Sequence, residues 1–143
     1  MNSEEGLGKF ISAQDGIYES ALEELKAGMK YGHWMWFVFL QIKELGNSQT
    51  ARLYGLSDLP DARLCLGHPV LGSRLIACAE ALLAIEHCCA GEILGDTDAL
   101  KLRSSMTLFD NASQEKDTVF TQVLGKFFHG NRCQFTMKKT GPC

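Results

Sequence analysis

The segment from Val70 to about Cys89 is the sequence feature that most restricts the fold. Its apolar residues recur every three or four positions, which places them on one face of an α-helix. The core-facing set is Leu71, Leu75, Cys78, Leu82, Leu83 and Ile85. Segments near residues 15–28, 99–109 and 117–128 show the same spacing, and alternating β and α units are absent. The pattern predicts an all-α protein.

A second constraint is the apolar run from Trp34 to Leu40. In so short a run, periodicity does not separate a buried strand from a buried helix. A lone strand would have no partner, so we predict a central buried helix. With shorter helices expected near 48–54 and 60–67, the predicted fold is a compact single-domain array of roughly six to eight helices.

Charge and apolar content exclude some classes of function. The 143 residues carry 14 basic and 17 acidic side chains, a net charge of -3, whereas a nucleic-acid-binding domain normally has a basic excess. We therefore expect no nucleic-acid partner. The longest apolar run is far shorter than the roughly 20 residues that span a bilayer, so no membrane partner is expected. No secretory signal is visible at the first residues, which favours a cytoplasmic protein.

The chain has six cysteines: Cys65, Cys78, Cys88, Cys89, Cys133 and Cys143. Without a secretory signal, reduced thiols are the expected state. No C-x-x-C pair is present, so no zinc site is predicted. A phosphate-binding loop, a dinucleotide fingerprint and a serine nucleophile motif are also missing. The sequence predicts no cofactor, and whether the protein is an enzyme stays open.

The strongest candidate ligand site is the segment Lys101 to Ser105. Lys101, Arg103 and the hydroxyl groups of Ser104 and Ser105 lie near a predicted helix start, where backbone N–H groups favour anions. Arg103 could hold a phosphate or carboxylate through two parallel hydrogen bonds. The other interpretation is structural: Arg103 pairs with a carboxylate of the protein, and both serines pack between helices.

His33, Trp34 and Trp36 form a second candidate group. A histidine suits proton transfer near neutral pH, and the two indole rings could form the wall of a ligand pocket. The alternative is that both tryptophans belong to the core, because large aromatic side chains dominate core energetics.

Five stretches of the sequence occur in the same order in a known family: Ala21–Gly28, His33–Phe37, Tyr54–Leu59, His68–Leu75 and Lys101–Phe109. Over the region from Phe10 to Gly130, the chain resembles the uncharacterised family known as domain of unknown function eighteen-ten, often mislabelled calpastatin. The resemblance implies a compact α-helical fold and supplies no activity.

The chain departs from that family at two places. Leu40 stands where the family usually has a proline, and the loss of the proline would straighten a kink. Residues 131–143 match neither the acidic turn nor the final leucine-rich helix of the family, and they show no apolar periodicity. We therefore predict one helical domain over residues 10–130, with flexible termini at 1–9 and 131–143.

Two functions remain open from the sequence. The first is a domain that binds a small anionic or nucleotide-like molecule, with Lys101, Arg103, Ser104 and Ser105 holding the anion and His33, Trp34 and Trp36 forming the wall. The alternative is a non-catalytic helical scaffold whose partner is another protein.

Overall fold

A computed structural model describes residues 3–46, 48–86, 89–113, 115 and 117–140. Within these residues the chain forms α-helices and one short 3₁₀ helix, and its only β feature is an isolated parallel bridge between Ile42 and Leu56. The all-α prediction is confirmed. The helices are α1 (Ser3–Gln14), α2 (Tyr18–Ala27), α3 (Met35–Val38), η1 (Lys43–Leu45), α4 (Gln49–Tyr54), α5 (Leu59–Gly67), α6 (Leu71–Ala84), α7 (Ala90–Leu94), α8 (Asp96–Ala112), α9 (Val119–Phe128) and α10 (Gln134–Thr140). The ten α-helices of the described residues exceed the expected six to eight, because α1, α7 and α10 form outside the segments that the sequence predicts as helices.

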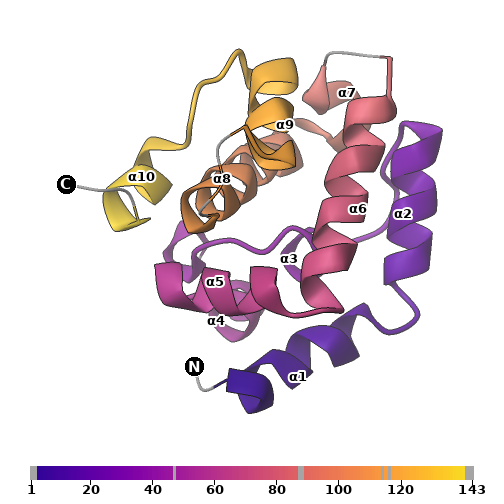
Figure 1. The fold of residues 1–143 in the computed structure, drawn as a ribbon. Coiled ribbons are helices and arrows are strands. Elements are labelled where there is room, and N and C mark those ends of the chain that lie inside the picture. Colours follow the sequence, from indigo (N-terminus) through magenta and orange to yellow (C-terminus); the bar gives the residue numbers. More distant parts are fainter. Residues whose placement is uncertain (1–2, 47, 87–88, 114, 116, 141–143) are drawn as a thin grey trace.

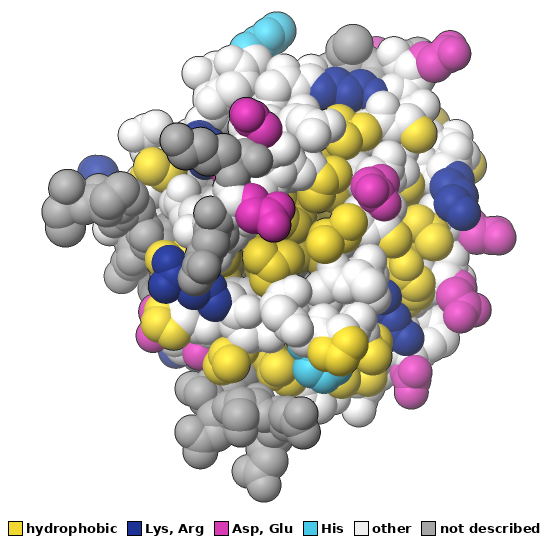
Figure 2. All heavy atoms as spheres, viewed as in Figure 1, with side chains coloured by type: hydrophobic (Ala, Val, Ile, Leu, Met, Phe, Trp, Pro, Cys, Tyr) yellow, Lys and Arg dark blue, Asp and Glu magenta, His cyan; other side chains and the backbone are white. Residues whose placement is uncertain are grey.

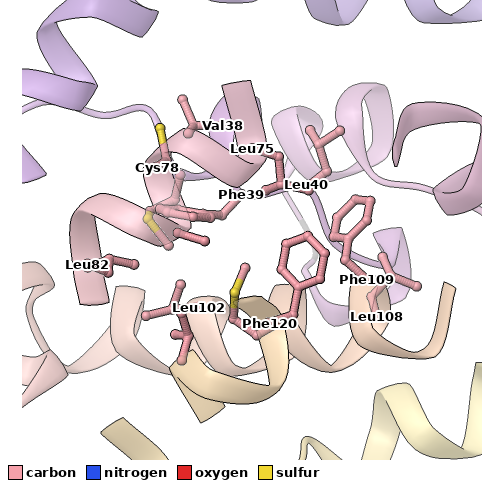
Figure 3. Packing of buried hydrophobic residues seen from close by; sticks show 14 of the residues in the cluster. Val38, Phe39, Leu40, Leu75, Cys78, Leu82, Leu102, Leu108, Phe109 and Phe120 are labelled. Atoms are coloured by element: carbon pink, nitrogen blue, oxygen red, sulfur yellow. The ribbon is translucent and has the colours of Figure 1, made fainter. Parts of the chain in front are cut away.

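Helix α8 is the centre of the packing. Helices α5, α7, α9 and α10 all contact it, while α2 lies alongside α6 (Figure 1). Because neighbours surround α8, even its hydroxyl-bearing residues Ser104, Ser105 and Thr107 are buried. Figure 3 shows apolar side chains from the α3 region, α6, α8 and α9 meeting in the core between these helices. None of the described helices has the length and apolar character needed to cross a bilayer.

The aromatic block is buried, but its helix is shorter than expected. Helix α3 ends at Val38, and the backbone of Phe39 leaves helical geometry with φ -103° and ψ 83°. Leu40 and Ile42 then continue in non-helical backbone and remain buried. The helix therefore ends here although Leu40 replaces the family's usual proline. The sequence did not predict this helix end, because a continuous apolar run is compatible with both helical and extended backbone when it is buried.

The segment after Gly130 differs from the expected loose tail. Residues 134–140 form α10, which packs against α8 (Figure 1). Cys133 and Thr136 are buried, and the Cys133 sulfur lies 3.2 Å from the Ser104 hydroxyl. The Arg132 guanidinium forms an ion pair with Asp110 of α8. The sequence shows little sign of this helix, because the buried residues here are Cys133, just before the helix, and Thr136 within it, and these do not form an apolar stripe.

A lysine of α9 covers the C-terminal end of α6. The Lys126 ammonium group donates hydrogen bonds to the carbonyl oxygens of Leu82 (3.1 Å), Leu83 (3.0 Å) and Ile85. The last carbonyls of a helix have no partner within the helix, and a cation there also interacts favourably with the helix dipole. One side chain thus links two helices that are more than 40 residues apart in sequence.

Replacing Lys126 with methionine should lower the free energy of unfolding by about 1.5–3 kcal/mol, because hydrogen bonds from a charged donor to these carbonyls are lost while the apolar stem is kept. Urea denaturation followed by circular dichroism measures the change. Lys26→Met, at an exposed position of α2, is the matched control and should change stability by less than about 0.5 kcal/mol. Equal effects of the two substitutions would show that Lys126 does not stabilise the end of α6.

Candidate functional site

The site begins with a carboxylate of α2 that fixes the loop before α3. One oxygen of Glu24, Oε1, accepts hydrogen bonds from the backbone N–H groups of Tyr31 (2.7 Å) and Gly32 (2.9 Å) and from Trp34 Nε1 (2.9 Å). Burial acts to raise the pKa of Glu24, but these three donors and the charge of Lys30 hold the pKa below its ordinary value of 4.5. Glu24 is therefore an ionised anchor for this loop.

Close packing inside the loop explains the glycine at position 32. A Cβ atom on Gly32 would lie 3.0 Å from Trp34 Cδ1 and 3.5 Å from Glu24 Oε2. A larger residue would press on the indole and on the carboxylate that holds it. The chain then turns into α3 with Trp34 buried and His33 exposed.

Two lysines meet at Asp98 in the first turn of α8. Lys30 Nζ lies 2.8 Å from Asp98 Oδ2, and Lys101 Nζ lies 3.1 Å from Asp98 Oδ1. Lys30 also donates to the carbonyl of Gly32 and lies over the Trp34 ring, 5.2 Å from its centroid. Lys30 is thus held by several partners, whereas Asp98 is the one described partner of the half-buried Lys101 ammonium.

The two lysines determine the direction in which the pKa of Asp98 is shifted. Burial acts to raise the pKa of its carboxyl group, but the hydrogen bonds and charges of Lys30 and Lys101 hold the pKa below its ordinary value of 3.8. Asp98 therefore stays ionised at neutral pH. Among the residues that line the adjacent cavity, Asp98 balances one of the two lysine charges and leaves one positive charge, while the ionised Glu24 lies outside that lining.

These residues surround a cavity of about 370 Å³. Its described lining comes from the α2–α3 loop and α3, from the start of α4, and from the first turns of α8: Lys30, His33, Met35, Trp36, Phe37, Ser48, Thr50, Asp98 and Lys101. The volume falls within the range of about 300–1,000 Å³ that is typical of small-molecule sites. The cavity combines exposed polar groups with an aromatic and thioether wall, so it suits a small ligand with a negative charge and an apolar part.

The sequence matches the family described as "Protein of unknown function (DUF1810)" over residues 4–140. The chain belongs to the DUF1810 family. A solved structure of a conserved hypothetical protein, Rv1873 from Mycobacterium tuberculosis, is 41% identical in sequence and superimposes with a TM-score of 0.91, covering 96% of this chain and 97% of its own. No protein with a curated description matches the sequence.

The DUF1810 match confirms the family expected from the sequence and extends beyond the expected region of Phe10 to Gly130. It reaches residue 140 and so includes α10. The DUF1810 fold of this chain therefore has a final helix, although that helix is not leucine-rich. The family description and the similar solved structure supply a fold and no activity.

The structure of this DUF1810 protein brings three of the expected site residues together. His33, Trp36 and Lys101 line the same cavity although they come from different parts of the chain. Trp36 is largely buried, with Gly46 beside its ring, so only part of the indole faces the cavity. Trp34 is buried against Glu24 and Lys30 instead of lining the cavity.

The other expected anion-binding residues, Arg103, Ser104 and Ser105, are not among the residues that line this cavity. Successive residues of an α-helix are rotated by about 100°, so Lys101 and Arg103 lie on nearly opposite sides of α8. Ser104 is buried near Cys133, and Ser105 is fully buried. The Nε atom of Arg103 and the Ser105 hydroxyl are buried with no hydrogen-bond partner among the described residues. Proximity in sequence therefore did not produce the expected four-residue anion site.

Sequence reasoning missed Lys30, Asp98 and Glu24 as parts of the site. Asp98 and Lys101 carry a local signal, because opposite charges three residues apart share one face of a helix. Lys30 is separated from Asp98 by 68 positions, and no pattern in a single sequence predicts their contact. Glu24 looks like any acidic residue on the polar side of α2.

A second hollow of about 550 Å³ lies between α5, α6 and the start of α9, and its floor is mainly apolar. Figure 2 shows hydrophobic side chains gathered in the middle of the face that is turned toward the viewer in Figure 1. Its described charged residues are Arg63 and Glu115, which balance each other, and Arg63 Nε already donates to the carbonyl of Ala112 (3.3 Å). This hollow has fewer convergent polar groups than the cavity beside Lys101, so it is not the candidate site.

The described cysteines offer little accessible chemistry. Cys65, Cys78, Cys89 and Cys133 are free thiols, and three of them are buried. In the described part of the chain, no group of three His, Cys, Asp or Glu side chains lies close enough to hold a metal ion. Cys88 and Cys143 lie outside the described residues.

Thiol reactivity should differ strongly among these cysteines. Burial raises the pKa of Cys65 and of Cys78 to about 12, so both should remain protonated and react slowly with a thiol-specific reagent at pH 8. The exposed Cys89 should react rapidly. Mass spectrometry of alkylated peptides measures each rate, and Cys89→Ser should remove a fast phase. Rapid labelling of Cys65 in the folded protein would contradict the burial of this residue of α5.

Proposed function

We propose that this DUF1810 protein binds a small anionic, nucleotide-like molecule in the cavity formed by the α2–α3 loop, α3, α4 and α8. The observation that supports this function is the convergence of His33 and Lys101 on a cavity with an aromatic wall and an excess of positive charge. Lys30 also lines the cavity and forms an ion pair with Asp98.

Lys101 is the cation best placed to contact the anion. Asp98 occupies one donor direction of its ammonium group, and the side chain is 30% exposed, so its other N–H groups remain accessible. The Met35, Trp36 and Phe37 side chains can contact a flat apolar group on the same ligand. A nucleoside monophosphate combines both features and suits a cavity of this size.

Isothermal titration calorimetry with inorganic phosphate and with adenosine monophosphate tests the function. The nucleotide should bind more tightly than phosphate, because it adds apolar contacts to the same charge interaction. Lys101→Gln should weaken binding of both by about tenfold, which corresponds to about 1.4 kcal/mol. Added salt should weaken binding as well, since the charges are only partly buried.

Lys26→Gln removes the same charge from the exposed side of α2 and serves as the matched control. It should leave both affinities unchanged. If neither ligand binds the wild-type protein at millimolar concentration, the cavity is not an anion site, and the non-catalytic scaffold with a protein partner becomes the better proposal.

A further inference from the structure

The loop from Lys30 to Trp34 is held by two ionised carboxylates that come from opposite sides. Glu24 of α2 accepts hydrogen bonds from three N–H groups of the loop. Asp98 of α8 forms an ion pair with the ammonium group of Lys30, the first residue of the loop. The other described hydrogen bonds of the loop backbone lie near its two ends: Lys30 N–H donates to the carbonyl of Ile93 (2.7 Å), the Lys30 side chain donates to the carbonyl of Gly32, and the carbonyl of Trp34 accepts from the first turn of α3. The conformation of this loop therefore depends strongly on Glu24.

The same loop supplies one side of the ligand cavity. Lys30 and His33 line the cavity directly, and Trp34 leads into α3, which carries Met35 and Trp36 of the wall. The opposite side comes from the start of α4 and from α8. Glu24 is absent from the lining itself, so its effect on a ligand would be transmitted through the loop.

We propose that Glu24 is a positioning residue of this cavity: it fixes the Lys30–Trp34 loop so that His33 and Lys101 face one ligand. This inference rests on the proposed function, and it assigns a role to a residue that does not touch the ligand. The charged side chains close to Glu24 and its loop are Lys30 and, beyond it, Asp98 and Lys101. Lys30 favours the ionised form of Glu24, which is the stronger hydrogen-bond acceptor.

Loss of the carboxylate leaves three donors without their shared acceptor. The Trp34 indole N–H and the Gly32 N–H are partly buried, so the loop must move to satisfy them. Such movement displaces His33 relative to Lys101 without changing either side chain. A displacement of His33 by about 1 Å is enough to weaken the binding of a ligand that contacts both His33 and Lys101.

Sulfate is a suitable probe, because it keeps its double negative charge over the mildly acidic range in which phosphate changes protonation. Sulfate affinity should fall at least tenfold in Glu24→Ala and by a smaller factor in Glu24→Gln, whose amide oxygen still accepts hydrogen bonds but lacks the charge. Glu23→Ala removes a neighbouring exposed carboxylate of the same helix and should bind sulfate as the wild type does. All titrations are made well below the melting temperature of each variant.

Nuclear magnetic resonance supplies a readout that a general loss of stability would not change. The chain has two tryptophans, so the ¹H–¹⁵N spectrum contains two indole N–H signals, which Trp36→Phe assigns. In Glu24→Ala the Trp34 signal should move strongly while the Trp36 signal moves little. In Glu24→Gln the Trp34 signal should lie between those of Glu24→Ala and the wild type.

The outcomes separate the two proposals. If wild type binds sulfate and Glu24→Ala binds it equally well, the positioning role is wrong and the proposed function stands. If wild type binds no sulfate, phosphate or nucleotide, the proposed function fails and the role of Glu24 in binding fails with it. An unmoved Trp34 indole signal in Glu24→Ala would also overturn the positioning role, because the loop would then not depend on the carboxylate.

Discussion

Replacing Phe109 with alanine should lower the free energy of unfolding by about 3–5 kcal/mol, one of the largest effects expected for a single substitution in this chain. Phe109 is fully buried in α8, and its ring lies 5.9 Å from that of Phe120 in α9 (Figure 3). The substitution removes the apolar contacts of the ring and leaves a cavity that the surrounding helices fill only in part. Chemical denaturation measured by tryptophan fluorescence gives the change.

Leu100→Ala is the control for this experiment. Leu100 lies in the same helix, but 57% of it is exposed, so its truncation should cost less than about 1 kcal/mol. Both substitutions place alanine in α8 and differ mainly in burial. Similar losses for the two variants would contradict the placement of α8 at the centre of the packing.

Ending the chain after Gly130 should lower the free energy of unfolding by at least about 3 kcal/mol. The truncation removes the Arg132 partner of Asp110, whose side chain is only 10% exposed, and loss of one member of such a pair is costly. It also uncovers the part of α8 that contacts Cys133 and Thr136. Thermal and urea denaturation of the truncated protein measure the effect.

This expectation reverses what the sequence alone predicts, since a loose tail could be removed with little effect on stability. A shorter truncation that removes only residues 141–143 retains α10 and serves as the control. If the two truncated proteins are equally stable, α10 contributes nothing to the fold, and the flexible terminus expected from the sequence is the better description.

The hydrophobic pattern predicted the helices whose partners cover one face. Helices α2, α6 and α9 each bury a stripe at helical spacing, so their existence follows from the sequence, although α6 ends at Ala84, earlier than expected. Helix α3 lies within a run buried on all sides, where periodicity carries no information about backbone conformation. Near α10 the buried residues are Cys133, just before the helix, and the polar Thr136 within it, and these two give no apolar stripe to detect.

The candidate site was predictable only as separate pieces. The residue types that favour an anion identified Lys101, and the unusual aromatic block identified His33 and Trp36. Their approach to one another depends on how α3 and α8 pack, which is a property of the tertiary fold. Arg103 was misplaced for a simpler reason: residues two positions apart in a helix face different neighbours.

The bond network around Lys126 has a consequence for how the molecule opens. Helix ends normally fray, so their amide hydrogens exchange with solvent through small local openings. The last carbonyls of α6 are instead held by a side chain of α9, and that helix is itself packed on α8. The final turn of α6 cannot unwind alone unless Lys126 is released. Its amides should therefore exchange as slowly as those at the middle of α6, through the same cooperative opening that detaches α9.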